Sequence, residues 1–361
     1  ERAGAGRDLR AAGESPPGAQ TAMHDSPDPT STVGRAGLGA VVVGDHVYLI
    51  GGHSDHSPLK ALVAFEPSDE DASSGKWTEL PPMQARRSYL AVAALDKQIY
   101  AIGGGADNRM LNTMEVFDVE KNAWVVWFHL NAISGPPRFS LPPMQSKRMQ
   151  HAAAAAEGKV FVAGGFDGTR DMATFECFDP ARNQWMWLDS MSARRSYLAL
   201  TLAGGHIFAI GGQDRLSGSD RAHATVEAFD LYSERWYERP PLQAPRIAPA
   251  AATLIGDSGE EVIYVCGGSN GEEVLASVEC YTVNSDGGTW SAAPPMSMPR
   301  LSHVAVVVRN KLYVIGGSDG QGDTLDTFEC FDPKAGCWSQ PMRIGSLPDP
   351  TKEGSETSSG F

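Results

Sequence analysis

The residues best suited to chemistry in this chain are charged and recur at regular intervals. Five arginines lie 16 residues before a Gly-Gly pair and a sixth lies 21 residues before one; in chain order they are Arg35, Arg87, Arg148, Arg195, Arg246 and Arg300. A glutamate recurs in five later apolar runs, as in Met114-Glu115-Val116-Phe117-Asp118, whereas Val63 takes its place in the first. Arginines bind anions at a surface, or form ion pairs with glutamates inside a protein. The nearly matching numbers favour structural Arg–Glu pairs.

Other possible catalytic or metal-binding groups are weaker. His53-Ser54-Asp55-His56 places two histidines three residues apart in a loop, which is a poor metal signal on its own. Ser285-Asp286-Gly287-Gly288 is typical of a turn. The nine histidines are scattered, and no convergent ligand set is visible. We therefore predict no catalytic residues, no metal and no cofactor.

Short β-strands must position these residues. Six apolar runs end in a Gly-Gly pair, at 51, 103, 164, 211, 267 and 316, so the steps are 52, 61, 47, 56 and 49 residues. Two runs rich in β-branched residues, such as Val304 to Val308 and Leu312 to Ile315, predict a hairpin before each pair. A third run follows, and a tryptophan closes each repeat. Each repeat is therefore expected to form four short strands.

A four-stranded unit of about 50 residues cannot bury both of its faces alone, but radial stacking of such units can. The order of Arg, Gly-Gly, Glu-x-Phe/Tyr-Asp and Trp resembles the kelch repeat from residue 35 to about 342. This resemblance predicts an all-β fold, a six-bladed β-propeller of six kelch repeats with four antiparallel strands each. Residues 34–344 would form the propeller, with disordered segments at 1–33 and 345–361.

By propeller geometry, the links between blades and the loops after Gly-Gly emerge at the same end. Because arginines collect there, we expect a basic face that binds an acidic protein or peptide. The predicted face contains Arg86, Tyr89, Arg109, Arg148, Arg170, Arg194, Tyr197, Arg215, Arg246, Arg300 and His303. The alternative is a set of structural arginines among ordinary solvated charges.

The second repeat carries 14 extra residues between Trp124 and Met144. Within them, Trp127 and Phe128 would anchor a partner if they were exposed on the rim. Removal of the 14 residues leaves a normal repeat end, so an error in the gene model is the alternative explanation.

Composition limits the class of partner. The net charge is −14, with 44 acidic against 30 basic residues, which disfavours nucleic acid. No apolar run approaches the ~20 residues of a membrane helix. Five cysteines without paired spacing favour reduced thiols and a cytoplasmic or nuclear location.

These features predict a protein-interaction module. The resemblance to kelch-like substrate receptors implies substrate recognition for a cullin-type ubiquitin ligase, although no BTB domain is visible in this chain; a scaffold role is the other possibility. The alternative from another class is a propeller enzyme that acts on a sugar or other small molecule at the central channel.

Overall fold

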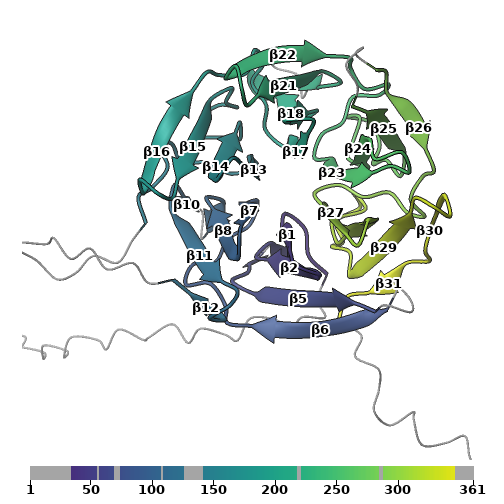
Figure 1. Ribbon diagram of the computed structural model, residues 1–361, viewed down its shortest axis with the longest axis horizontal. Helices are drawn as coiled ribbons and strands as arrows, with labels where there is room; N and C mark the ends of the chain where they lie inside the picture. The colour runs from purple at the N-terminus through teal and green to yellow at the C-terminus, as the bar shows by residue number, and fades with distance from the viewer. Residues whose placement is uncertain are drawn as a thin grey trace, which may run out of the picture.

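The computed structural model describes residues 34–54, 57–68, 74–106, 109–125, 141–217, 221–283 and 288–345. Six blades of antiparallel strands are arranged around a central axis, each with four strands in succession from the axis outward (Figure 1). The predicted six-bladed propeller is therefore confirmed. No helix within the described ranges has both the length and the apolar character needed to cross a bilayer.

The strands follow one order in every blade. The inner strands are β1 (Gly39–Val43), β7 (Ala91–Leu95), β13 (Ala152–Ala156), β17 (Ala199–Ala203), β23 (Ala250–Ile255) and β27 (Val304–Val308). The second strands are β2 (His46–Ile50), β8 (Gln98–Ile102), β14 (Lys159–Ala163), β18 (His206–Ile210), β24 (Glu261–Cys266) and β28 (Lys311–Ile315). The third strands are β5 (Leu62–Pro67), β11 (Met114–Asp118), β15 (Phe175–Asp179), β21 (Val226–Asp230), β25 (Val278–Thr282) and β29 (Thr327–Asp332). The outer strands are β6 (Gly75–Leu80), β12 (Ala123–Trp124), β16 (Gln184–Leu188), β22 (Arg235–Arg239), β26 (Ser291–Ala293) and β30 (Cys337–Trp338).

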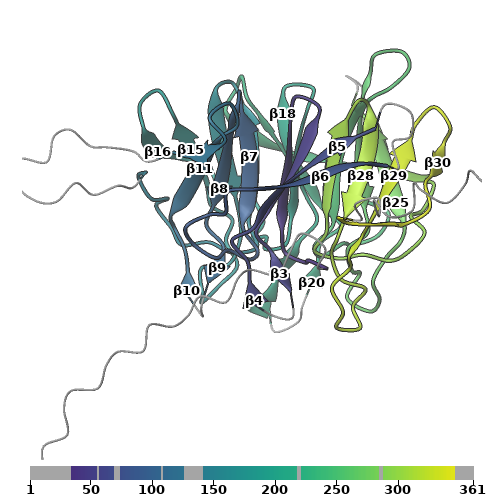
Figure 2. The same ribbon diagram turned by 90° about the horizontal axis from the view of Figure 1, so that it is seen from below.

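Several short strands and one short helix lie in the loops at one end of the ring. They are β3 (His53–Ser54), β4 (Ser57–Pro58), β9 (Gly105–Ala106), β10 (Arg109–Met110), β19 (Gln213–Asp214), the 3-10 helix η1 (Arg215–Ser217) and β20 (Arg221–Ala222). Figure 2 shows β3, β4, β9, β10 and β20 together at the lower end. Single bridges join each of these loops to the link that enters the same blade, as in Ser88 with Gly105 and Ser196 with Gln213. The expectation that links and loops share one end is thus confirmed.

The hydrophobic core is divided among the interfaces between blades. One apolar cluster lies at each interface; between blades 3 and 4, for example, Phe175 of β15 packs with Phe229 of β21 and with Trp236. The closing tryptophans also donate across interfaces, as Trp185 Nε1 does to the Pro142 carbonyl at 2.9 Å. Burial between neighbours explains why the repeats must stack.

The Gly-Gly pairs allow close contact between blades. Gly51 and Gly52 have φ of 60° and 90°, a region that side chains disfavour. A Cβ on Gly51 would lie 2.5 Å from the Arg87 carbonyl oxygen of the next link. The Gly52 amide donates to that same carbonyl at 2.9 Å. Glycine is therefore required by both conformation and space.

The ring closes by packing between the first and last blades. In the described part of the chain, blade 1 uses only strands from residues 39–80, and blade 6 uses only strands from 304–343, which include β31 (Met342–Arg343) beside β29. Blades 1 and 6 share one apolar cluster that contains Val47, Phe65, Tyr313 and Ile344. Arg309 Nη1 also donates to the Pro67 carbonyl at 2.9 Å.

Candidate functional site

The repeated arginines form ion pairs inside their blades. The five pairs, with Nη2 to Oε1 distances of 2.8–3.1 Å, are Arg87–Glu115, Arg148–Glu176, Arg195–Glu227, Arg246–Glu279 and Arg300–Glu329. Each glutamate also accepts a backbone amide of the preceding link, as Glu176 does from Gln145 at 2.9 Å. The pairs therefore fasten each link to the blade that it enters, as the structural explanation predicted.

Three of these arginines were predicted to lie on the binding face. Arg148, Arg246 and Arg300 are at most 1% exposed, because their guanidinium groups point into the blades and bond the Gly-Gly carbonyls. Their side chains therefore do not belong to the surface. Arg35, the arginine of the first repeat, is equally buried, and it too interacts with other groups of the protein.

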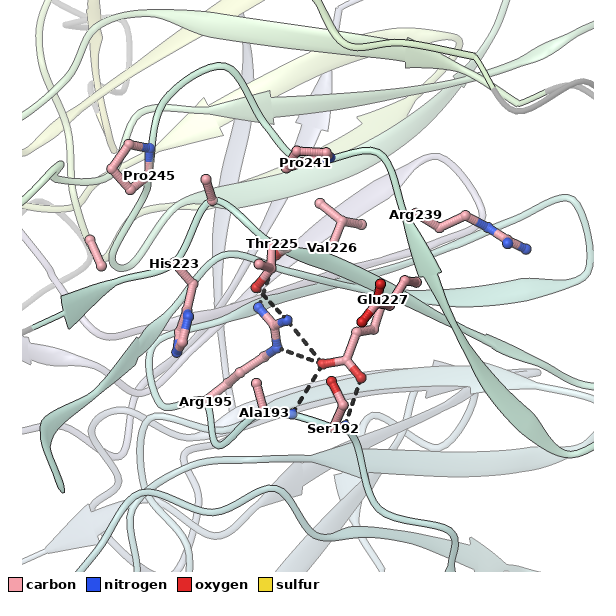
Figure 3. A pocket seen from close by; sticks show the side chains of 13 residues that line it. Ser192, Ala193, Arg195, His223, Thr225, Val226, Glu227, Arg239, Pro241 and Pro245 are labelled. Atoms are coloured by element: carbon pink, nitrogen blue, oxygen red, sulfur yellow. Dashed lines mark hydrogen bonds and ion pairs between the residues drawn. The ribbon is translucent and has the colours of Figure 1, made fainter. Parts of the chain in front are cut away.

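A cavity lies beside one such pair on blade 4 (Figure 3). Its volume is about 700 Å³, and Arg195 and Glu227 line it with His223, Glu238 and Arg239. Arg195 donates to both Glu227 and Thr225 and to the Gly211 carbonyl, which occupies its whole hydrogen-bonding fork. Burial lowers the pKa of Arg195, and Glu227 opposes that shift. Because the same pair recurs in other blades, it builds the fold here too.

Two residues after each repeated arginine, the chain forms a closed ring of hydrogen bonds, which we call the collar. Its members are Gly37, Tyr89, Gln150, Tyr197, Ala248 and Ser302. Each amide donates to the carbonyl of the member in the preceding blade at 2.7–3.1 Å, and Gly37 donates to Ser302. All six have φ between 51° and 58°. The collar backbone has thus paired its own groups, and only its side chains are left to contact a ligand.

The large collar side chains come from adjacent blades. Tyr89, Gln150 and Tyr197 enter from blades 2, 3 and 4, opposite the small residues of blades 5, 6 and 1. The two tyrosine rings meet edge to face at 5.7 Å, and Gln150 Nε2 donates to Tyr197 Oη at 2.7 Å. Burial raises the pKa of both phenols, so each keeps its proton at neutral pH.

Arg215 joins this group from the loop of blade 4. Its guanidinium lies over the rings of Phe166 and Tyr197, 5.1 and 5.6 Å from their centroids. It donates to Gln150 Oε1 at 3.1 Å and to Asp171 Oδ1 at 3.2 Å. The Arg215 side chain is 33% exposed, whereas Asp171 is fully covered. A partly exposed cation is therefore fixed beside the tyrosines.

The structure places the other predicted residues around this group. Arg109, Arg170 and Arg194 are exposed, and Arg170 pairs with Asp167 at 3.5 Å. Arg86 is half-buried and donates to the Pro58 carbonyl at 3.2 Å. Trp127 and Phe128 lie outside the described residues.

His303 was also predicted on the face, but it is buried, in the position that Leu38 has in the first repeat. Its ring packs against Gly267 of the neighbouring blade. Burial is the main cause that lowers the pKa of His303 to about 3, with Arg300 and Arg246 adding to it. It is therefore a neutral part of the core and contributes no charge to the surface.

The predicted single basic face consists of two regions of opposite charge. On the links and loops of blades 2–4, the exposed or half-buried basic residues are Arg86, Arg109, Lys147, Arg170, Arg194 and Arg215. The loops of blades 5 and 6, residues 269–277 and 318–326, carry instead Glu272, Glu273, Asp319, Asp323 and Asp326, with no lysine or arginine. We call these two regions the basic half and the acidic half.

The six inner strands supply no titratable side chain, since their residues are Gly, Ala, Val, Leu, Ile and Thr. A reaction in the channel would have to take its acid or base from the turns at either end. Among the described residues, no three His, Cys, Asp or Glu side chains are grouped to hold a metal ion. His56 lies outside that part of the chain.

Comparison with family models identifies the repeats. The kelch motif matches residues 34–84, 86–126 and 147–192, and the KLHDC2/KLHL20/DRC7 Kelch-repeats domain matches 198–359. The chain is a kelch-repeat β-propeller.

Relatives of this kelch propeller include Kelch-like protein 35 of Mus musculus, 28% identical over 73% of the chain and 40% of the relative. Spermatocyte protein spe-26 of Caenorhabditis elegans is 27% identical over 74% of the chain and 40% of the relative. The chain thus matches about two fifths of the length of these proteins. The solved structure of YjhT covers 84% of the chain and 97% of its own, with a TM-score of 0.66 and 17% identity, and so supports the fold.

Sequence reasoning found Tyr89, Tyr197 and Arg215 but missed Gln150, Phe166 and Asp171. Gln150 follows the repeated arginine at the same distance as the two tyrosines, and this position was the available signal. Asp171 contacts Arg215 of the neighbouring blade, 44 residues further along the chain, and no local pattern predicts that contact.

Proposed function

We propose that this kelch propeller recognises a protein partner through the collar end of the ring. The observation that carries the proposal is that large polar and aromatic side chains, which are absent from the collar positions of blades 1, 5 and 6, gather there on a framework that is repeated in all six blades. The nearby Arg215 and the exposed arginines of the basic half favour an acidic segment of the partner, because charge-assisted hydrogen bonds to carboxylates are strong.

The family supports a protein-binding role at the coarse level, since its matched relatives are named as kelch-like proteins. Within that role, we propose substrate recognition for a cullin-type ubiquitin ligase, with a scaffold as the other outcome. Co-purification of a cullin with the protein made from the full-length transcript tests this step. If no cullin were present in the purified complex, the ligase role would be excluded and the scaffold role would be favoured.

Charge reversal tests the proposed face. Arg86→Glu combined with Arg194→Glu should weaken partner capture, with each lost contact costing about 1–3 kcal/mol. Added salt should weaken the wild-type complex as well. The measurement is quantitative proximity labelling in the native cell, followed by affinity measurement with the enriched partner.

A matched control reverses two exposed charges at the other end of the ring. Lys97→Glu with Arg182→Glu changes the net charge equally, and these side chains are 63% and 68% exposed. Unchanged capture by the first variant, or equal loss in both, would place the binding surface elsewhere. Thermal melts of both variants separate a binding loss from unfolding.

A further inference from the structure

The collar end has another cavity, which Tyr89 of the collar lines on one side. Its volume is about 620 Å³, and it lies between the loop of blade 6 and the first residues of blade 1. Asp323 and Asp326 supply its charge, His53 and Tyr89 supply rings, and Ser302, Ser318 and Thr324 supply hydroxyls. None of the described residues that line it is a lysine or arginine. Carboxylates, ring faces and hydroxyl acceptors together suit an ammonium or guanidinium group.

The two carboxylates are accessible to such a group. Asp323 is exposed, and the Asp326 side chain is 38% exposed. Arg343 lies 3.7 Å from Asp326, but its own side chain is 79% exposed, so this ion pair contributes little. A cation brought by a partner could replace it at low cost.

Tyr89 connects this cavity with the basic half. Its ring contacts Tyr197 at 5.7 Å on one side and His53 at 5.1 Å on the other, and it also lines the cavity. The surface is therefore continuous from Arg215, through the two tyrosines, to Asp323. Its charge changes sign along that path.

We propose that the partner segment is dipolar: an acidic side chain of the segment lies in the basic half, and a lysine or arginine of the same segment enters the cavity of Asp323 and Asp326. This inference rests on the proposed function, because it names the chemistry of the segment that the collar end holds. A purely acidic segment would be repelled by the five carboxylates of blades 5 and 6, whereas a dipolar one is attracted at both ends.

Selection from a phage library of random peptides tests the proposal and does not require the natural partner. The purified chain should enrich peptides that carry an acidic and a basic residue at a recurring separation. The test variant, Asp323→Asn with Asp326→Asn, should still enrich the acidic residue but lose the basic one. A synthetic peptide of the selected sequence should bind this variant roughly tenfold more weakly, as expected for one lost charged contact.

The control variant, Asp45→Asn with Asp257→Asn, removes the same charge from exposed residues at the other end and should select as the wild type does. If the test variant unfolds, Asp323→Asn alone serves, because that residue is exposed. Selection of acidic residues without a recurring basic one, or equal selection by the test variant, would overturn the dipolar segment but leave the proposed function intact. No enrichment, or enrichment indifferent to Arg86→Glu with Arg194→Glu, would overturn both.

Discussion

Two positions in each link, only two residues apart, have opposite characters. The first is an arginine in all six repeats, buried in its blade. The second is a collar member, and its residue type changes from blade to blade although φ and the backbone hydrogen bond are repeated six times. At the first position the side chain builds the framework. At the second the backbone does so, which leaves the side chain available for recognition.

Removal of one partner of a buried Arg–Glu ion pair should have the largest effect on stability. Glu176→Gln removes a carboxylate whose side chain is fully covered and leaves the Arg148 guanidinium, equally covered, without its counter-charge. Breaking such a pair costs about 3–5 kcal/mol of unfolding free energy. Denaturant unfolding followed by tryptophan fluorescence measures the loss.

Glu115→Gln is the matched comparison, because that glutamate is 15% exposed and water can partly solvate the remaining Arg87. We expect a smaller loss there. Equal losses at both sites, or none at Glu176, would mean that the hydrogen bonds rather than the charges hold the links.

The framework was largely predictable because it is periodic. Gly-Gly, Glu and Trp recur with spacings that specify four strands and a ring, and the Arg–Glu pairs followed from matching numbers. The direction of a side chain was harder to obtain. Arg148, Arg246 and Arg300 were assigned both to the framework and to the surface, since spacing places a residue in a link without showing that it points into the blade.

The candidate site was less predictable because it depends on contacts between blades. Arg215 reaches Gln150 from 65 residues away, and Tyr89 touches Tyr197 through the collar. The acidic half was overlooked because the arginines were considered together as a single rim. Charge on a propeller must instead be assigned blade by blade.

The next largest effect on stability is expected in two blades in which a histidine takes the place of a buried leucine. His151 and His303 occupy the position of Leu38, Leu90 and Leu198, and burial is the main cause that lowers both pKa values to about 3. Between that value and about 6.5, only the unfolded chain binds the proton, so stability falls as the pH falls below 6.5. At pH 5 the loss is about 2 kcal/mol for each histidine.

Replacement by the leucine of the other repeats should remove this dependence. We expect His151→Leu with His303→Leu to lose less stability than the wild type between pH 7.5 and pH 5. The carboxylates are the same in both proteins, so the difference between parallel denaturant titrations measures the contribution of the two histidines. An unaltered acid sensitivity would show that these imidazoles are protonated in the folded protein.

The smallest effect separates collar backbone from collar side chain. Ala248 has φ of 53°, a conformation that costs a non-glycine residue about 1–2 kcal/mol. Glycine relieves this strain but gains freedom in the unfolded chain. Ala248→Gly should therefore change the unfolding free energy by less than about 1 kcal/mol and leave partner binding intact, if the hydrogen bonds alone define the collar.

Gly37→Ala is the reverse substitution at the equivalent position, and it should behave differently. Its φ is 58°, and the new Cβ would lie 2.9 Å from the Tyr89 ring. The methyl group must move that ring, which touches both Tyr197 and the cavity of Asp323. We expect a modest loss of stability but a clear loss of affinity for the selected peptide, measured by fluorescence anisotropy. Normal affinity in Gly37→Ala would mean that Tyr89 does not join the two halves. Lost affinity in Ala248→Gly would mean that the collar needs its side chains to keep its shape, and the contrast between the two positions would fail.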